Sequence, residues 1–362
     1  MKNTRGLFGF LGVAIVGIAL SCPAYAWPPT FGGEFTFTNP AIQAAQEGSF
    51  VNSDQSEGAR DRMAEILKTR CAGGECTLET IQNHYGVDTV RVTYRDGWWF
   101  QVSTDPAVVE VQTKAATYEQ LLAMKERIQK DIFDVAKQAG MTPHENTGGG
   151  HIHIGMTSAL DDSALLFRNF DADFENHSEL SSGILSHDHS NSPPVAALTT
   201  EQKTKFAKVL ADFDHGRLRT VRAFAKRLQA DVYAQTPSGW DPPEKYHALN
   251  VTRIAGDDFP EAEKTFEVRS IRPQQSANDF LLETHLFEMR LLRLKQELRP
   301  IHYYENPAPL TEAMKAARFY EYVHDAGLNW DDYKKWVPEQ LQQTAPTLQC
   351  DLVLSSGAVG NL

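Results

Sequence analysis

The sequence lacks the short motifs that define several large enzyme classes. It contains no Gly-x-x-x-x-Gly-Lys-Ser/Thr phosphate loop, no Gly-x-Gly-x-x-Gly dinucleotide fingerprint and no Gly-x-Ser-x-Gly nucleophile elbow. Positive charge is also scarce, with 35 Lys and Arg against 47 Asp and Glu and a formal net charge of −12. No dense Lys/Arg run offsets this balance. Because such a surface repels a polyanion, we expect no nucleic-acid partner.

Long apolar runs are lacking as well, except near the start of the chain. Leu7–Leu20 is uncharged and apolar, follows Lys2 and Arg5, and precedes Ala24-Tyr25-Ala26. This order is typical of a secretory signal peptide. No later segment approaches the roughly 18 uncharged residues of a membrane helix. We therefore expect residues 1–26 to be removed by cleavage after Ala26, leaving an extracytoplasmic (periplasmic or secreted) protein with no transmembrane segment.

Cysteine is rare, with four in 362 residues. Cys22 lies inside the expected signal peptide; a lipoprotein cleaved before it is the less favoured alternative, because the usual leucine three positions upstream is absent. In an oxidising compartment Cys71 and Cys76 are candidates for a disulfide that closes a small, turn-rich loop. A zinc site is the weaker interpretation, since no second cysteine pair completes it. The sequence assigns no partner to Cys350.

The rest of the chain is interpreted as one domain, residues 27–345, followed by a C-terminal tail at 346–362. A polar, His- and Ser-rich interval at 178–194 is expected to be a surface loop. Strands are expected at Gly33–Thr38, Thr89–Tyr94, Trp98–Ser103, Val108–Thr113, His151–Met156 and Thr265–Ile271. Helices are expected at about 55–69, at Thr117–Ala139, and at about 199–235, 276–298, 310–325 and 330–342. Early strands and late helices predict an α+β fold, with helices packed on one face of a largely antiparallel sheet.

The most unusual local sequence is Gly148–Gly155, in which three glycines precede His-Ile-His-Ile-Gly. In a strand, residues i and i+2 share a face, so His151 and His153 project together while the isoleucines pack on the other side. A half-exposed polar pair is the structural alternative. Imidazole nitrogens suit zinc and also mixed magnesium or manganese sites beside carboxylates. The pair therefore indicates a functional site.

Three isolated acids lie in apolar strand segments. They are Glu34 after Gly32-Gly33, Glu110 within Val-Val-Glu-Val, and Glu267 within Thr-Phe-Glu-Val-Arg. A buried acid needs a partner. Each one alone is equally compatible with a simple ion pair or an exposed strand face, but together with His153 they favour a metal-centred site.

Arginines gather near the last of these acids. Arg269 follows Glu267 at strand spacing, and Arg253 and Arg272 are close in sequence. The fork of a guanidinium matches a carboxylate or phosphate ligand, so we expect an anion-binding role. The alternative is a lateral Glu267–Arg269 pair on a solvated face.

The order of these segments resembles the amidoligase family, within the carboxylate–amine ligases that share the glutamine synthetase catalytic fold. The resemblance covers roughly residues 31–295. It rests on four segments in order: Gly33-Glu34; Asp105–Glu110; Gly149–Gly155; and Tyr246–Asn250 followed by Phe266–Arg269, with Ser276–Leu281 resembling the start of the helix beyond.

The resemblance implies which residues act. Glu34, Glu110, His153 and Glu267 would ligate Mg²⁺ or Mn²⁺. Substrate or phosphate would be bound by Arg269, and His151, Arg253 and Arg272 are further candidates for this role. Arg269 and Glu267 are the expected catalytic residues. The implied reaction transfers the γ-phosphoryl group of ATP to a carboxylate, which an amine then attacks to give an amide.

One residue departs from the family pattern. The family's opening strand usually has two acids at i and i+2, and the second position here is Thr36. That departure, and the scarcity of ATP outside the cytoplasm, favour a second hypothesis, a non-catalytic binding protein that keeps the fold. A third hypothesis is a metal-dependent amide hydrolase. The leading hypothesis is the ligase, acting on a small-molecule or peptide substrate with a carboxylate and an amine.

Overall fold

The computed structural model describes residues 28–46, 53–83, 86–105, 108–144, 149–185, 192–235, 245–305 and 310–347. The expected signal peptide, Cys350 and almost all of the expected C-terminal tail lie outside these residues. Predictions that concern them stay predictions.

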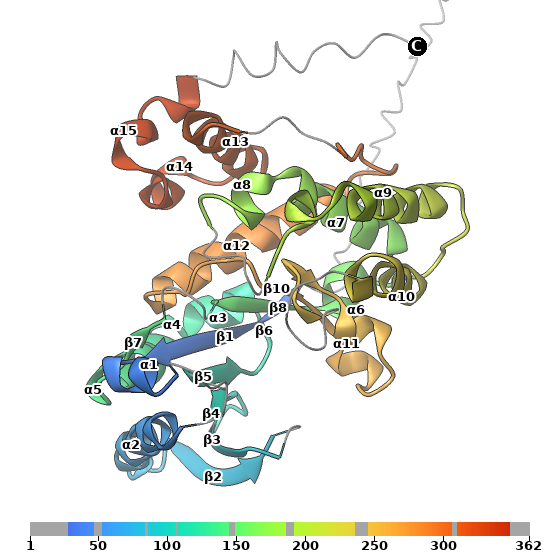
Figure 1. The fold of residues 1–362 in the computed structure, drawn as a ribbon. Helices are drawn as coiled ribbons and strands as arrows, with labels where there is room; N and C mark the ends of the chain where they lie inside the picture. Colours follow the sequence, from blue (N-terminus) through green and yellow to red (C-terminus); the bar gives the residue numbers. More distant parts are fainter. Residues whose placement is uncertain are drawn as a thin grey trace, which may run out of the picture.

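The core is one sheet in the strand order β2-β3-β4-β5-β1-β8-β10-β9, with β6 and β7 also pairing with β1. All pairings among the described strands are antiparallel. Figure 1 shows the sheet running from β2 at the bottom to β8 and β10 near the middle of the molecule. The strands are β1 Thr30–Thr38, β2 Cys76–Gln82, β3 Asp88–Tyr94, β4 Trp99–Asp105, β5 Val108–Thr113, β6 Ala116–Thr117, β7 Thr142–Pro143, β8 His151–Gly155, β9 Leu249–Asn250 and β10 Thr265–Val268.

The helices alternate with the strands along the chain, and α13–α15 lie at the far end of the molecule from β2 (Figure 1). They are α1 Pro40–Gln46, α2 Asp54–Cys71, α3 Tyr118–Ala123, α4 Lys125–Ile128, α5 Asp134–Gln138, α6 Met156–Leu160, α7 Ala164–Asn176, α8 Ser178–Ser181, α9 Thr200–Asp214, α10 Val221–Asp231, α11 Thr252–Ala255, α12 Ala277–Leu294, α13 Glu312–Asp325, α14 Trp330–Tyr333 and α15 Glu339–Gln342.

Because successive side chains of each strand point to opposite sides, the sheet has one apolar face and one polar face. On the apolar face Phe35 of β1 packs against Phe133 and against Phe280 of α12, with ring centroids 5.0 and 5.1 Å apart. Phe266 of β10 packs against Phe167 and Phe170 of α7, at 5.3 and 5.2 Å. Burying such rings against the sheet is the main stabilising term of a core of this kind. The α+β class, with helices packed on a largely antiparallel sheet, is confirmed.

The expected helix 117–139 is present but interrupted. Thr117 and Gln120 form a capping box at its start, and Gly140, with φ of +80°, follows its end. Regular α geometry is lost at Met124, and Gln129–Phe133 forms a π turn. The extra residue in such a turn re-aims the side chains that follow. It accompanies tertiary contacts that no local pattern encodes, including a hydrogen bond of 3.1 Å from the Ala277 N–H to the Gln129 side chain.

Other elements differ from the sequence expectation. The stretch 199–235 forms two helices, α9 and α10, because Gly216 adopts a φ of +73° between them. Strand β2 and helix α7 were not predicted. Part of the expected surface loop 178–194 is instead packed, since Ser178–Ser181 form α8 and Leu180 is fully buried.

Cys71 at the end of α2 and Cys76 at the start of β2 are joined by a disulfide, as the sequence indicated. The bridge closes the tight connection between the helix and the edge strand. Among the described helices, none combines the length and apolar character needed to cross a membrane.

Candidate metal centre

Acids and histidines from three neighbouring strands meet at the centre of the sheet. Antiparallel pairing places Glu34 of β1 opposite His151 of β8, and Glu267 of β10 opposite His153 of β8. Residues directly opposite each other point to the same face, as do i and i+2 within a strand. All four side chains therefore emerge on the polar face, away from the phenylalanine core.

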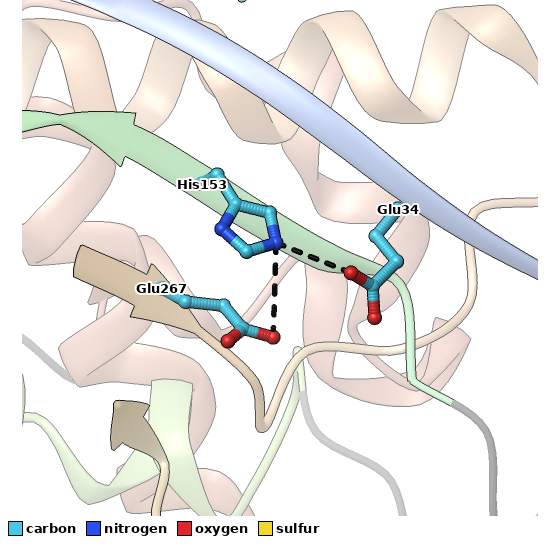
Figure 2. Close-up of side chains that lie close together, drawn as sticks. All are labelled: Glu34, His153 and Glu267. Carbon is cyan, nitrogen blue, oxygen red and sulfur yellow. Dashed lines mark hydrogen bonds and ion pairs between the residues drawn. The ribbon is translucent and has the colours of Figure 1, made fainter. Parts of the chain in front are cut away.

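Figure 2 shows Glu34, His153 and Glu267 converging, and one donor atom from each lies within 4.8 Å of the others. His153 Nε2 is 3.2 Å from Glu34 Oε2 and 3.9 Å from Glu267 Oε1. Its other nitrogen, Nδ1, lies 3.3 Å from Thr265 Oγ1, a contact that orients the ring. One imidazole nitrogen and two carboxylate oxygens form a donor set that fits Mg²⁺, Mn²⁺ or Zn²⁺. These three residues are named below as the metal cluster.

The two acids of the metal cluster are held in their ionised form. Burial alone would raise the pKa of Glu34, but the charges and hydrogen bonds of His151 and His153 hold it well below its usual range. Burial would likewise raise the pKa of Glu267, and Arg269 with the two histidines holds it well below its usual range. Ionised carboxylates are the state in which a divalent cation binds.

Glu110 lies beside the metal cluster rather than in it. Gln112 Nε2 donates to both Glu110 Oε1 and Glu34 Oε2, at 2.7 and 3.3 Å. Burial, together with repulsion from Glu34 and Asp105, raises the pKa of Glu110 well above its usual range. A cation nearby would favour the ionised form of Glu110. Its expected role as a metal ligand stays a prediction.

His151 and Arg269 are in direct contact with the acids of the metal cluster. His151 Nδ1 lies 2.6 Å from Glu34 Oε1 and 3.0 Å from Glu267 Oε1, between the two acids. Arg269 Nη1 donates to Glu267 Oε1 at 2.7 Å, and its guanidinium lies 5.5 Å from the centre of the Tyr246 ring. The buried site therefore combines negative and positive groups, as recognition of a metal-bound anion requires.

The other two arginines make different contacts. The Arg253 guanidinium lies 4.9 Å from the centre of the Phe259 ring. The backbone N–H of Arg272 donates to the Leu185 carbonyl at 2.8 Å. Neither contact is with the metal cluster, and the expected substrate-binding role of both residues stays a prediction.

The glycines before β8 leave space for neighbouring side chains. A Cβ at Gly149 would lie 2.7 Å from His151 Nε2, and one at Gly150 would overlap the amide of Gln274. Gln274 Nε2 in turn donates to the Gly150 carbonyl at 3.1 Å. The run of glycines thus allows β8 to approach its neighbours closely.

Sequence reasoning missed two amide side chains that orient the acids. Asn250 lies opposite Glu267 and donates to its Oε2 at 2.8 Å. Gln112 lies opposite Glu34 and bridges it to Glu110. The only local signal was a polar residue at an alternate position of an apolar strand, and that signal does not reveal which strand pairs with which.

The sequence and the fold were compared with those of known proteins. No family model matches the chain, and no curated protein does. Among solved structures, ligand-free GmaS, a glutamine synthetase-like gamma-glutamylmethylamide synthetase, is similar with a TM-score of 0.37 and 12% sequence identity, over 92% of this chain and 71% of that chain. Because the likeness is so distant, function is inferred below from the side chains of this chain.

Proposed function

We propose that this protein is an exported, metal- and ATP-dependent carboxylate–amine ligase resembling the amidoligase family. The observation that carries the proposal is the metal cluster with Arg269 hydrogen-bonded to one of its acids. Such a site places a divalent cation and a guanidinium side by side. Phosphoryl transfer depends mostly on this kind of positioning and charge neutralisation.

The residues have distinct roles in this proposal. When bound, Mg²⁺ or Mn²⁺ neutralises phosphate charge and orients the transferred group. Glu34, His153 and Glu267 hold the cation, and Glu110 adds a ligand next to it. Arg269 contacts phosphate or the substrate carboxylate while keeping its hydrogen bond to Glu267. The substrate is a small molecule or peptide that offers a carboxylate and an amine, and nucleic acid is not a partner.

One observation favours a non-catalytic binding protein instead. Thr36 lies opposite Glu110, where the family usually has a second acid, and its hydroxyl donates to the Gly149 carbonyl at 3.2 Å. The hydroxyl therefore supports the glycine segment and offers no carboxylate for a second cation. A protein that binds a metal-associated ligand without turning it over would have this arrangement.

The deciding experiment titrates residues 27–362 with ATP in the presence of Mg²⁺ or Mn²⁺. We expect cation-dependent ATP binding that Glu267→Gln abolishes, since the amide removes a ligand charge. Glu126→Gln, which changes an exposed acid on α4, is the matched control and should bind normally. Circular dichroism of each variant checks that it is folded.

Each outcome separates the hypotheses. If the native chain has no affinity for ATP, or Glu267→Gln leaves that affinity unchanged, the ligase is excluded. Cation binding without ATP binding supports the binding protein. Amide hydrolysis in the absence of nucleotide supports the metal-dependent hydrolase.

A further inference from the structure

A row of polar side chains crosses four strands and ends at the metal cluster. Arg91 of β3 lies opposite Gln101 of β4, Gln101 lies opposite Gln112 of β5, and Gln112 lies opposite Glu34 of β1. The four residues Arg91, Gln101, Gln112 and Glu34 are called the polar row. Since opposite residues share a face, the row runs over the polar face at right angles to the strands.

Continuous hydrogen bonds connect the polar row. Arg91 Nη2 donates to Gln101 Oε1 at 3.1 Å, and Gln101 Nε2 donates to Gln112 Oε1 at 2.9 Å. Gln112 Nε2 then donates to Glu34 Oε2 at 3.3 Å and to Glu110 Oε1 at 2.7 Å. Both hydrogens of the last amide thus point at acids from two different strands.

The two ends of the row determine its direction. A guanidinium has only donors, and an ionised carboxylate has only acceptors. If both amides were flipped, an NH₂ group would face the guanidinium and a carbonyl oxygen would face the ionised carboxylate of Glu34. The Arg91 end is itself held in place, because its guanidinium lies 4.5 Å from the centre of the Trp99 ring. Only one orientation of both glutamines is therefore favourable.

We propose that Gln112 and Arg91 are positioning residues for the metal cluster, with Arg91 acting through the two glutamines. The proposal rests on the metal site of the proposed function. Gln112 holds Glu34 and Glu110 at a fixed spacing, so that their oxygens are already placed when a cation arrives. Arg91 keeps the amide of Gln112 turned with its donors toward the acids. Outer partners of this kind typically contribute about 10- to 100-fold to metal affinity.

The test measures Mn²⁺ affinity of residues 27–362 by calorimetry for variants at both ends of the row. Gln112→Met keeps the length of the side chain without its hydrogen bonds and should weaken Mn²⁺ binding by about tenfold or more. Arg91→Met should weaken it less, and Arg91→Lys, which keeps a donor-only group, should restore part of the loss. The lysine rescue distinguishes positioning from packing.

Arg91→Glu provides the sharpest comparison. Coulombic attraction alone predicts that replacing a positive by a negative charge strengthens cation binding. The polar row predicts the opposite, because an acceptor at this end turns both amides and directs the carbonyl oxygen of Gln112 toward Glu34. We expect Arg91→Glu to bind Mn²⁺ more weakly than Arg91→Met. Arg95→Met and Arg95→Glu, at an exposed arginine in the β3–β4 turn, are the matched controls.

The outcomes separate this inference from the proposed function. If Gln112→Met binds Mn²⁺ with the affinity of the native chain, or Arg91→Glu binds it more tightly than the native chain, the positioning role is overturned and the metal site still stands. A native chain that takes up no Mn²⁺ overturns both. If Gln112→Met does not fold, the Arg91 series decides alone, because Arg91 on β3 lies two strands from Glu110 on β5 and three strands from Glu34 on β1.

Discussion

Asp171 provides the most direct test of how burial controls charge in this protein. It lies on α7 with its side chain fully buried, and neither carboxylate oxygen has a hydrogen-bond partner within the described residues. Burial raises the pKa of Asp171 from 3.8 to about 8, against a smaller opposing effect of the Arg168 charge. The acid is therefore neutral in the folded protein at pH 7 and ionised in the unfolded chain.

The sign of the effect on stability follows from these two pKa values. Between pH 4 and pH 8 the unfolded chain releases this proton and the folded chain keeps it, so stability falls as the pH rises. Each rise of one pH unit in that interval lowers the free energy of unfolding by about 1.4 kcal/mol. At pH 7 the accumulated cost is about 4 kcal/mol. Asp171→Asn puts a neutral amide of the same shape in this place and removes the cost.

The measurement is urea unfolding of native chain and variant at several values between about pH 5 and about pH 7.5, followed by circular dichroism. We expect the free energy of unfolding of Asp171→Asn, relative to native, to rise by about 1.4 kcal/mol per pH unit. Asp88→Asn, which changes an exposed acid at the start of β3, is the control and should show no such slope. If the Asp171→Asn curve runs parallel to the native curve, Asp171 is not neutral in the folded state and the reasoning is refuted.

Two further predictions concern stability. Arg290 of α12 donates two hydrogen bonds to Asp173 of α7, at 2.7 and 2.6 Å, in a buried ion pair. Because Arg290→Met leaves this acid without its partner, it should lower the free energy of unfolding in urea by about 3 to 5 kcal/mol. A decrease below about 1 kcal/mol would contradict this role. The Cys71–Cys76 disulfide closes a short loop with a sequence separation of 5. Replacing both cysteines by alanine should therefore lower the free energy of unfolding, measured by thermal unfolding, by about 2 kcal/mol. A reductant should destabilise the native chain by the same amount and the double variant not at all.

Strand pairing explains why the residues of the metal cluster were predictable and the amides that orient its acids were not. Glu34 and His151 are 117 positions apart in the chain, yet their side chains meet at 2.6 Å. The sequence singled out each of them, because an acid or a histidine stands out in an apolar strand. It did not reveal Gln112 or Asn250, because a polar amide in a strand is ordinary until its cross-strand partner is known.

Local chemistry and tertiary structure determined different features of this protein. The sequence alone determined that His151 and His153 share a face, that Thr117 caps a helix and that Cys71 and Cys76 are close, because each depends on neighbouring residues. Only the tertiary structure decided that β1 and β10 flank β8, and so that Glu34 and Glu267 meet His153. Register between distant strands is set by packing of the whole apolar face, which no short segment contains.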